Sequence, residues 1–144
     1  MAIPALPTSL TLEIVTPDRA LVAEQVDEVE VPGSDGYFGV LPGHAPLLSS
    51  MQVGELWYRK GQEKHYLAIA FGFVEVLPDK VTVLAHIAER AEDIDLARAE
   101  KAMSRAEERV KVPGAPEIDF ERARVAMMKS LIRLQVASRA RTRA

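Results

Sequence analysis

The first part of the chain alternates apolar and polar residues with the period of β-strands. In the stretch LTLEIVT, Leu10, Leu12 and Ile14 alternate with Thr11 and Glu13, the pattern of a half-buried strand. The turn-forming sequences TPDR, PGSDG, KGQEK and LPDK separate the apolar runs. Short strands at such regular spacing predict an antiparallel β-sandwich or flattened barrel. The other expected strands are Glu28–Val31, Glu55–Lys60, His65–Ala70, Phe73–Leu77 and Val81–Ile87.

The hydrophobic period changes from Glu89 onward, where Ala, Glu, Arg and Met replace the β-branched residues. Apolar positions then recur every three or four residues, which predicts one face of an α-helix. Either Asp93 or Asp95 can cap the start of this helix. The sequence VPGAPE at 112–117 ends it, because proline cannot continue a helix and glycine suits its end. The positions on the expected face are Leu96, Ala99, Met103, Ala106 and Val110.

A second helix is expected to begin near Asp119. Two helices joined by a short connection predict an antiparallel helical hairpin. The chain is therefore expected to have two parts, a β-sandwich at 1–87 and a helical hairpin at 88–144. The apolar face of the second helix would contain Phe120, Ala123, Met127, Leu131 and Leu134.

Charge divides the chain at the same place. The net charge of -3 combines a balance of -6 in residues 1–87 with +3 in residues 88–144. The last stretch, from Arg122 to Ala144, has seven basic residues and no acid, which predicts an acidic partner surface. Nucleic acid is not the expected partner, because the β part is acidic and no aromatic residues interleave with the basic ones in the tail.

The candidate chemistry argues against an enzyme acting alone. The chain has no cysteine, which excludes disulfides and thiolate metal sites. Its three histidines, His44, His65 and His86, are scattered without a serine or acid at a catalytic spacing. The glycines do not form a phosphate-binding loop. We expect no catalytic residue, no metal site and no required cofactor. The longest apolar run, Tyr66–Val74, is too short to span a bilayer, and the opening MAIPALPTSL is a poor signal peptide.

The segment GYFGVLPGHAPLLS, Gly36 to Ser49, combines three glycines, two prolines and His44 among apolar residues. Such a loop is stiff and can present a contact surface to another protein. The alternative is a tight connection between two strands, with Pro42 and Pro46 only stiffening it. The residues themselves leave both interpretations open.

Three segments together resemble the epsilon subunit family of F-type ATP synthases. They are EIVTPDR, GSDGYFGVLPGHAPLLS and VTVLAHIAERAEDID, followed by the two helices, so the similarity covers nearly the whole chain. The resemblance implies a sandwich of about ten strands and a C-terminal hairpin on the rotor stalk. It also implies a peripheral location at the cytoplasmic face of the bacterial inner membrane, without bilayer insertion. The expected partners are the gamma subunit and the membrane c-ring.

The resemblance implies a role for the glycine- and proline-rich loop. In the family this loop meets the polar loops of the c-ring. Tyr37 stands where some members carry an acid that helps the contact. The implied contact residues are Tyr37, Gly43, His44, Ala45 and Pro46.

A second motif, IDLARA at Ile94–Ala99, resembles the pattern I/L-D-x-x-R-A with which some bacterial epsilon subunits bind ATP. Arg98 suits phosphate oxygens, because guanidinium groups form charge-assisted hydrogen bonds. Lys129 replaces an arginine and lacks its fork of donors. The alternative is a capped helix with exposed arginines. The implied regulatory ATP site comprises Glu89, Asp95, Arg98, Ala99, Arg105, Lys129 and Arg133.

The basic second helix completes the implied function. In the family the extended C-terminal helices face an acidic loop of the catalytic beta subunits and block ATP hydrolysis. The alternative to the whole assignment is a free-standing β-sandwich binding module with a helical dimerisation arm. The implied inhibitory residues are Arg122, Arg124, Lys129 and Arg133.

Overall fold

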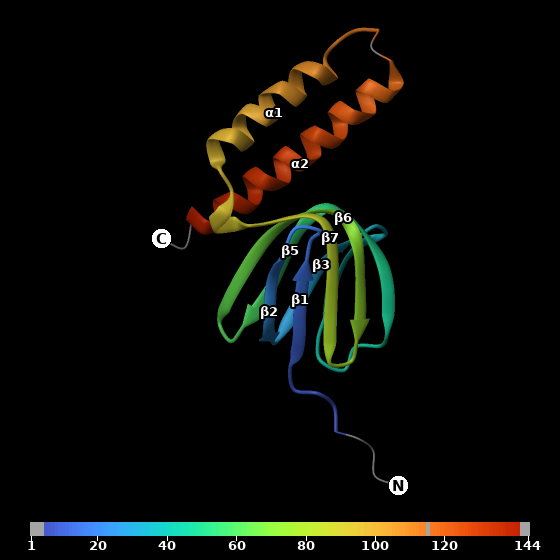
Figure 1. Cartoon of the computed structure of the whole chain (residues 1–144), viewed down its shortest axis with the longest axis vertical. Coiled ribbons are helices and arrows are strands. Elements are labelled where there is room, and N and C mark those ends of the chain that lie inside the picture. Colours follow the sequence, from blue (N-terminus) through green and yellow to red (C-terminus); the bar gives the residue numbers. More distant parts are fainter. Residues whose placement is uncertain (1–4, 115, 142–144) are drawn as a thin grey trace.

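A computed structural model describes residues 5–114 and 116–141 of the chain. Within these residues a seven-stranded sheet precedes a helical hairpin (Figure 1). The strands are β1 (Leu10–Val15), β2 (Ala20–Val26), β3 (Glu28–Gly33), β4 (Gly36–Val40), β5 (Leu47–Lys60), β6 (Glu63–Leu77) and β7 (Lys80–Arg90). The 3₁₀ turn η1 (Ala91–Asp93) leads into α1 (Leu96–Val110), and α2 (Glu117–Arg141) follows.

The sheet curls around a single core. Its strand order is β2-β1-β7-β6-β5-β3-β4, and every described strand contributes side chains to the buried cluster. Leu10, Leu12 and Ile14 are fully buried, which confirms the alternation expected for this strand. Burial of each such side chain stabilises the fold by roughly 1.5–3 kcal/mol. The sandwich therefore has a complete core of its own.

The strand count differs from the expected ten. Segments 65–70 and 73–77 belong to one strand, β6, because its pairing with β7 continues in the same register on both sides of Phe71. Phe71 and Gly72 have φ angles of 63° and 120°. The backbone of β6 is therefore locally irregular at these two residues, but the strand stays in the sheet. The pairing is also not wholly antiparallel, since β1 and β7 run parallel.

The hairpin starts where the sheet ends. Strand β7 continues beyond the boundary expected after residue 87, because Arg90 still pairs with Leu67. Of the two candidate caps, Asp95 is the one used: its Oδ1 accepts a hydrogen bond from the Arg98 N–H at 3.2 Å. Helix α1 ends at Val110, before the proline- and glycine-containing connection, as expected.

Small side chains bring the two helices together. Ala99 and Ala106 are buried on α1, while α2 buries Ala123, Ser130 and Ala137 at intervals of seven residues. The face predicted for α2 is wrong at two positions, because Phe120 and Leu131 are 39% and 46% exposed. Helix α2 contacts both α1 and the sandwich, so its buried positions do not follow one amphipathic stripe.

The C-terminal half of α2 is the part that lies closest to the sheet (Figure 1). Val136 is fully buried against Ala68 and Ala91, in a cluster separate from the sandwich core. Tyr66, Ile94, Ile132 and Ala140 pack around this cluster. Apolar docking of the hairpin thus depends on a small cluster rather than on the main core.

Candidate functional site

The interface between α2 and the sandwich contains an ion pair whose carboxylate is largely buried and whose guanidinium is partly exposed. Arg139 donates two hydrogen bonds to Glu55 of β5, from Nε to Oε2 at 3.2 Å and from Nη2 to Oε1 at 3.1 Å. The Glu55 side chain is 9% exposed and that of Arg139 42%. The hydrogen bonds and charge of Glu55 raise the pKa of Arg139 above its ordinary value. The Arg139 guanidinium also lies 5.1 Å from the Tyr66 ring centroid.

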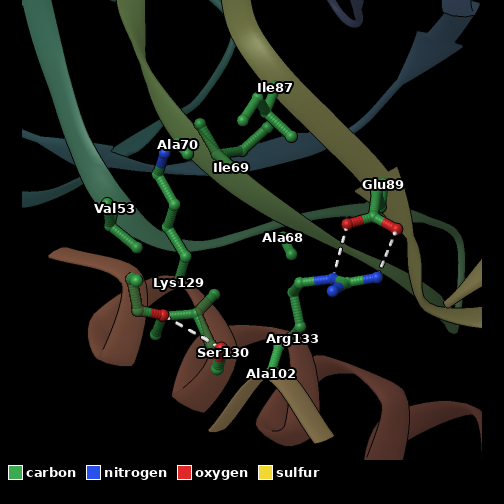
Figure 2. A pocket seen from close by; sticks show the side chains of 12 residues that line it. Val53, Ala68, Ile69, Ala70, Ile87, Glu89, Ala102, Lys129, Ser130 and Arg133 are labelled. Atoms are coloured by element: carbon green, nitrogen blue, oxygen red, sulfur yellow. Dashed lines mark hydrogen bonds and ion pairs between the residues drawn. The ribbon is translucent and has the colours of Figure 1, made fainter. Parts of the chain in front are cut away.

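A second ion pair joins α2 to β7. Arg133 Nε lies 2.7 Å from Glu89 Oε1, a close contact without hydrogen-bond geometry, and Nη2 donates to Oε2 at 3.2 Å (Figure 2). Both side chains are about a quarter exposed. Helix α2 is therefore held to the sandwich by two arginines that each face one carboxylate.

Between the Arg133 pair and Lys129 lies a cavity of about 270 Å³. Figure 2 shows sheet residues above it and α2 below it, with the Lys129 side chain reaching toward Ala70. Alanines contribute to both walls, which leaves the space unfilled. The lining residues are Val53, Ala68, Ile69, Ala70, Ile87, Glu89, Ala102, Ala126, Lys129, Ser130, Ile132 and Arg133.

The structure divides the implied nucleotide residues between two places. Glu89, Lys129 and Arg133 meet at the cavity, whereas Arg98 and Arg105 line a separate hollow formed by α1 residues. The other two have local structural roles. Asp95 caps α1 and Ala99 is buried in it.

The implied inhibitory residues also differ in their surroundings. Arg124 pairs with Glu121 of the same helix at 3.2 Å, while Arg133 is held by Glu89. Lys129 Nζ lies 5.6 Å from the Phe71 ring centroid. Arg122 is exposed. In the docked hairpin these four residues therefore do not form one continuous basic surface.

Residues 41–46 connect β4 and β5, so the tight connection between strands is present. The Gly43 N–H donates to Pro78 O at 2.7 Å, and the His44 N–H donates to Leu41 O at 3.1 Å. Gly43 has a φ of 89°, which favours glycine there. Ala45 and Pro46 are exposed. Backbone hydrogen bonds thus fix a loop that presents its tip to solvent.

Tyr37 lies at the other end of β4 from this loop. Its hydroxyl accepts a hydrogen bond from the Glu55 N–H at 3.0 Å, where the pairing of β3 with β5 shifts register. Glu55 thus contacts Tyr37 through its backbone and Arg139 through its side chain. Sequence reasoning missed Glu55 and counted Arg139 only among the seven basic residues of the last stretch. The available signal for Glu55 was a lone acid among the apolar residues of a strand.

The fold and these contacts define a class: a β-sandwich protein with a C-terminal helical arm that ion pairs hold against the sheet. In the described residues no helix is both long and apolar enough to cross a membrane. Residues 9–91 match the family model of the ATP synthase delta/epsilon chain β-sandwich domain, and residues 92–138 match its long α-helix domain. The chain belongs to the ATP synthase delta/epsilon chain family.

Relatives agree with this assignment. The chain is 48% identical over 130 residues to ATP synthase epsilon chain 2 of Syntrophotalea carbinolica, covering 90% of this chain and 94% of that protein. It is 48% identical over 132 residues to the ATP synthase epsilon chain of Nitratidesulfovibrio vulgaris (strain DP4), covering 92% and 98%. These names confirm the resemblance seen in the sequence. They describe a subunit of ATP synthase rather than an enzyme that acts alone.

A solved structure shares the fold. A chain in the cryo-EM structure of Euglena gracilis mitochondrial ATP synthase superposes with a TM-score of 0.81 at 24% identity. The superposition covers 94% of this chain and 85% of that chain.

Proposed function

We propose that this chain is a non-catalytic rotor-stalk subunit that links the gamma subunit to the membrane c-ring and regulates ATP hydrolysis through its hairpin. The observation that carries the proposal is the two-part build. The sandwich encloses a complete core, whereas the hairpin is attached through a small apolar cluster and two ion pairs. Such an arm can leave its docking surface while the sandwich stays folded.

The loop at 41–46 supports the c-ring contact. Its backbone is fixed before any partner binds, so little conformational entropy is lost on binding. Leu41, Leu47 and Leu48 beside it are 56%, 40% and 72% exposed, which gives the contact apolar area. Replacing His44 and Pro46 by glutamate should weaken the coupling of proton flow to catalysis and leave the sandwich folded. Unchanged proton pumping by this variant would contradict the assignment.

The hairpin supports the regulatory role. Docking engages Arg133 and Arg139 with Glu89 and Glu55, and extension would release both arginines toward another acidic surface. On the extended arm, Arg122, Arg124, Lys129 and Arg133 would face the catalytic beta subunits. The inhibited state then exchanges internal carboxylate partners for external ones, so a modest free-energy difference can govern the switch.

Truncation after Arg90 tests the regulatory proposal. This position keeps all of β7, whereas truncation after 87 would remove its last pairs. In native membranes carrying the truncated chain, ATP hydrolysis should rise while ATP synthesis is largely retained. A folded truncated chain that leaves hydrolysis unchanged would refute the inhibitory role. Co-purification of gamma, c and beta subunits with the full chain from native membranes tests the partners and the peripheral location, and recovery of the chain alone would favour a free-standing module.

ATP as a regulatory ligand remains a prediction. Arg98 and Arg105 do not share a cavity with Lys129 and Arg133, so a bound triphosphate would require the helices to shift. Calorimetry of the full chain with ATP, repeated with Arg98→Ala, measures this binding. Millimolar or tighter binding that the variant loses supports the nucleotide site, and no heat from either protein assigns IDLARA to helix capping alone.

A further inference from the structure

The Tyr37 side chain crosses one strand to reach the next. Strand β3 lies between β4 and β5 in the sheet, yet the hydroxyl of Tyr37 on β4 accepts a hydrogen bond from the Glu55 N–H of β5 at 3.0 Å. The pairing of β3 with β5 shifts register between Glu30 and Gly33 and gives Glu55 no partner residue on β3. The hydroxyl therefore takes the place that a backbone carbonyl has in a regular sheet.

Gly54 provides the space for this hydroxyl. A Cβ at Gly54 would overlap the Tyr37 hydroxyl and would lie 3.1 Å from Cζ of the same ring. Gly54 is not among the glycines with a positive φ, so its backbone conformation is open to other residues. The absence of a side chain at Gly54 thus serves the approach of Tyr37 to Glu55.

Glu55 is also the residue that holds the end of α2. Its backbone N–H is bonded to Tyr37, and its carboxylate accepts both hydrogen bonds from Arg139. Glu55 is buried in the docked state, where water cannot readily replace a lost partner. In an undocked chain the same N–H would reach water, so loss of the hydroxyl penalises the docked state more than the undocked one.

We propose that Tyr37 is a positioning residue for the docked hairpin: its hydroxyl fixes the Glu55 backbone at the register shift, so that the carboxylate meets Arg139. Strand β4, which carries Tyr37, leads directly into the loop at 41–46. One short strand therefore supports both the loop with the proposed c-ring contact and the carboxylate that docks the hairpin. The effect on docking rests on the proposed movement of the hairpin, because it requires an undocked state.

The docked fraction of the isolated full chain tests this role. It is measured from the distance between spin labels on cysteines introduced at Gln62 of the sandwich and Glu107 of α1. Tyr37→Phe keeps the ring and should lower the ratio of docked to undocked hairpins by about 3–10-fold. Tyr58→Phe is the matched control, since that hydroxyl is bonded to Glu24, and it should leave the ratio unchanged.

A second background separates positioning from a general effect on the sheet. In a chain that already carries Arg139→Ala, the Glu55 carboxylate has lost the guanidinium for which it is positioned. Tyr37→Phe should then change the ratio by less than about twofold. A loss of the same size in both backgrounds would show that the hydroxyl acts on the sandwich rather than through the ion pair, and would overturn the proposal.

Two other results would also overturn it. One is an equal loss in Tyr58→Phe. The other is a response to Arg139→Ala without a response to Tyr37→Phe, which would refute the role of Tyr37 alone. A label distance that neither Arg139→Ala nor Tyr37→Phe changes would refute the proposed hairpin movement together with this role.

Discussion

Removing the Arg139 guanidinium should release the hairpin. In the docked state the Glu55 side chain is 9% exposed and receives both hydrogen bonds from Arg139. Arg139→Ala leaves that carboxylate in a poorly hydrated position without its main cation. Once α2 leaves the sheet, Glu55 regains water, so the penalty falls on the docked state alone.

The size of the effect follows from this geometry. Removing one partner of a fully buried ion pair costs about 3–5 kcal/mol, and hydrogen bonds to charged groups contribute about 1.5–3 kcal/mol. Arg139 is 42% exposed, so solvent screening reduces its contribution. We expect docking to weaken by about 1.5–2 kcal/mol, which changes the ratio of docked to undocked hairpins by about 10–30-fold.

The absence of cysteine from the chain simplifies the assay. Single cysteines introduced at Gln62, between β5 and β6, and at Glu107 on α1 place spin labels on the sandwich and the hairpin, both at exposed positions. The distance distribution then gives the docked fraction directly. Arg124→Ala is the matched control, because Arg124 pairs with Glu121 on its own helix.

Two results would refute the reasoning about Glu55. One is a docked fraction in Arg139→Ala equal to that of the parent chain under conditions where both states are populated. The other is an equal loss in Arg124→Ala, which would show a general effect of charge. Adding Glu55→Gln to Arg139→Ala should recover part of the docking, because the unpaired carboxylate is then gone.

Three further predictions concern the folded core and the hairpin start. Burial, followed by the smaller effect of the Glu24 carboxylate, raises the pKa of Tyr58 from 10.0 to about 12. As pH rises, Tyr58 therefore loses its proton in the unfolded state before it does so in the folded state. The free energy of unfolding should fall between pH 10 and 12 by up to about 1.4 kcal/mol per pH unit. Urea unfolding should show that Tyr58→Phe removes this part of the slope, and identical slopes would contradict it. Gly72→Ala should destabilise the fold by about 3 kcal/mol or more, because its Cβ would overlap Leu84 O at a φ of 120°. Gly39→Ala, with open space around it, should cost far less in the same assay. Asp95→Ala should lower hairpin stability by about 1 kcal/mol and Asp95→Asn should not, as judged from helical circular dichroism on heating; equal melting of the two variants would argue against the cap.

The sequence predicts those elements of the fold whose signal is local. The strict alternation around Leu12 identifies β1, and the change of period after Glu89 identifies the hairpin. Strand β2 was not predicted, because Leu21 and Val22 are adjacent and both buried, which breaks the alternation of apolar and polar residues. Strand β4 was not predicted, because the glycines within GYFGV indicate a turn. The exposure of Leu131 is not predictable from the sequence, because α2 packs against two surfaces at once and its buried positions follow no single periodicity.

The site is less predictable for a related reason. Its ion pairs join residues far apart in the chain, such as Glu55 and Arg139, and nothing in either local sequence indicates the other. The motif IDLARA correctly suggests a helix start, since Asp95 is the cap. Whether Arg98 reaches the cavity depends on how α1 is rotated against α2, which is a tertiary property.

The parallel pairing of β1 with β7 also sets the order in which a growing chain can fold. Thr11 pairs with Lys80 and Val15 with Leu84. Strand β1 therefore lacks one of its two neighbouring strands until β7 has left the ribosome. The sandwich therefore closes only after nearly all of it has been synthesised. The hairpin follows in the chain, and its docking surface, which includes Glu55 and Glu89, already exists when α2 appears. Each newly made molecule should thus begin with its arm folded against the sandwich, before it meets any partner.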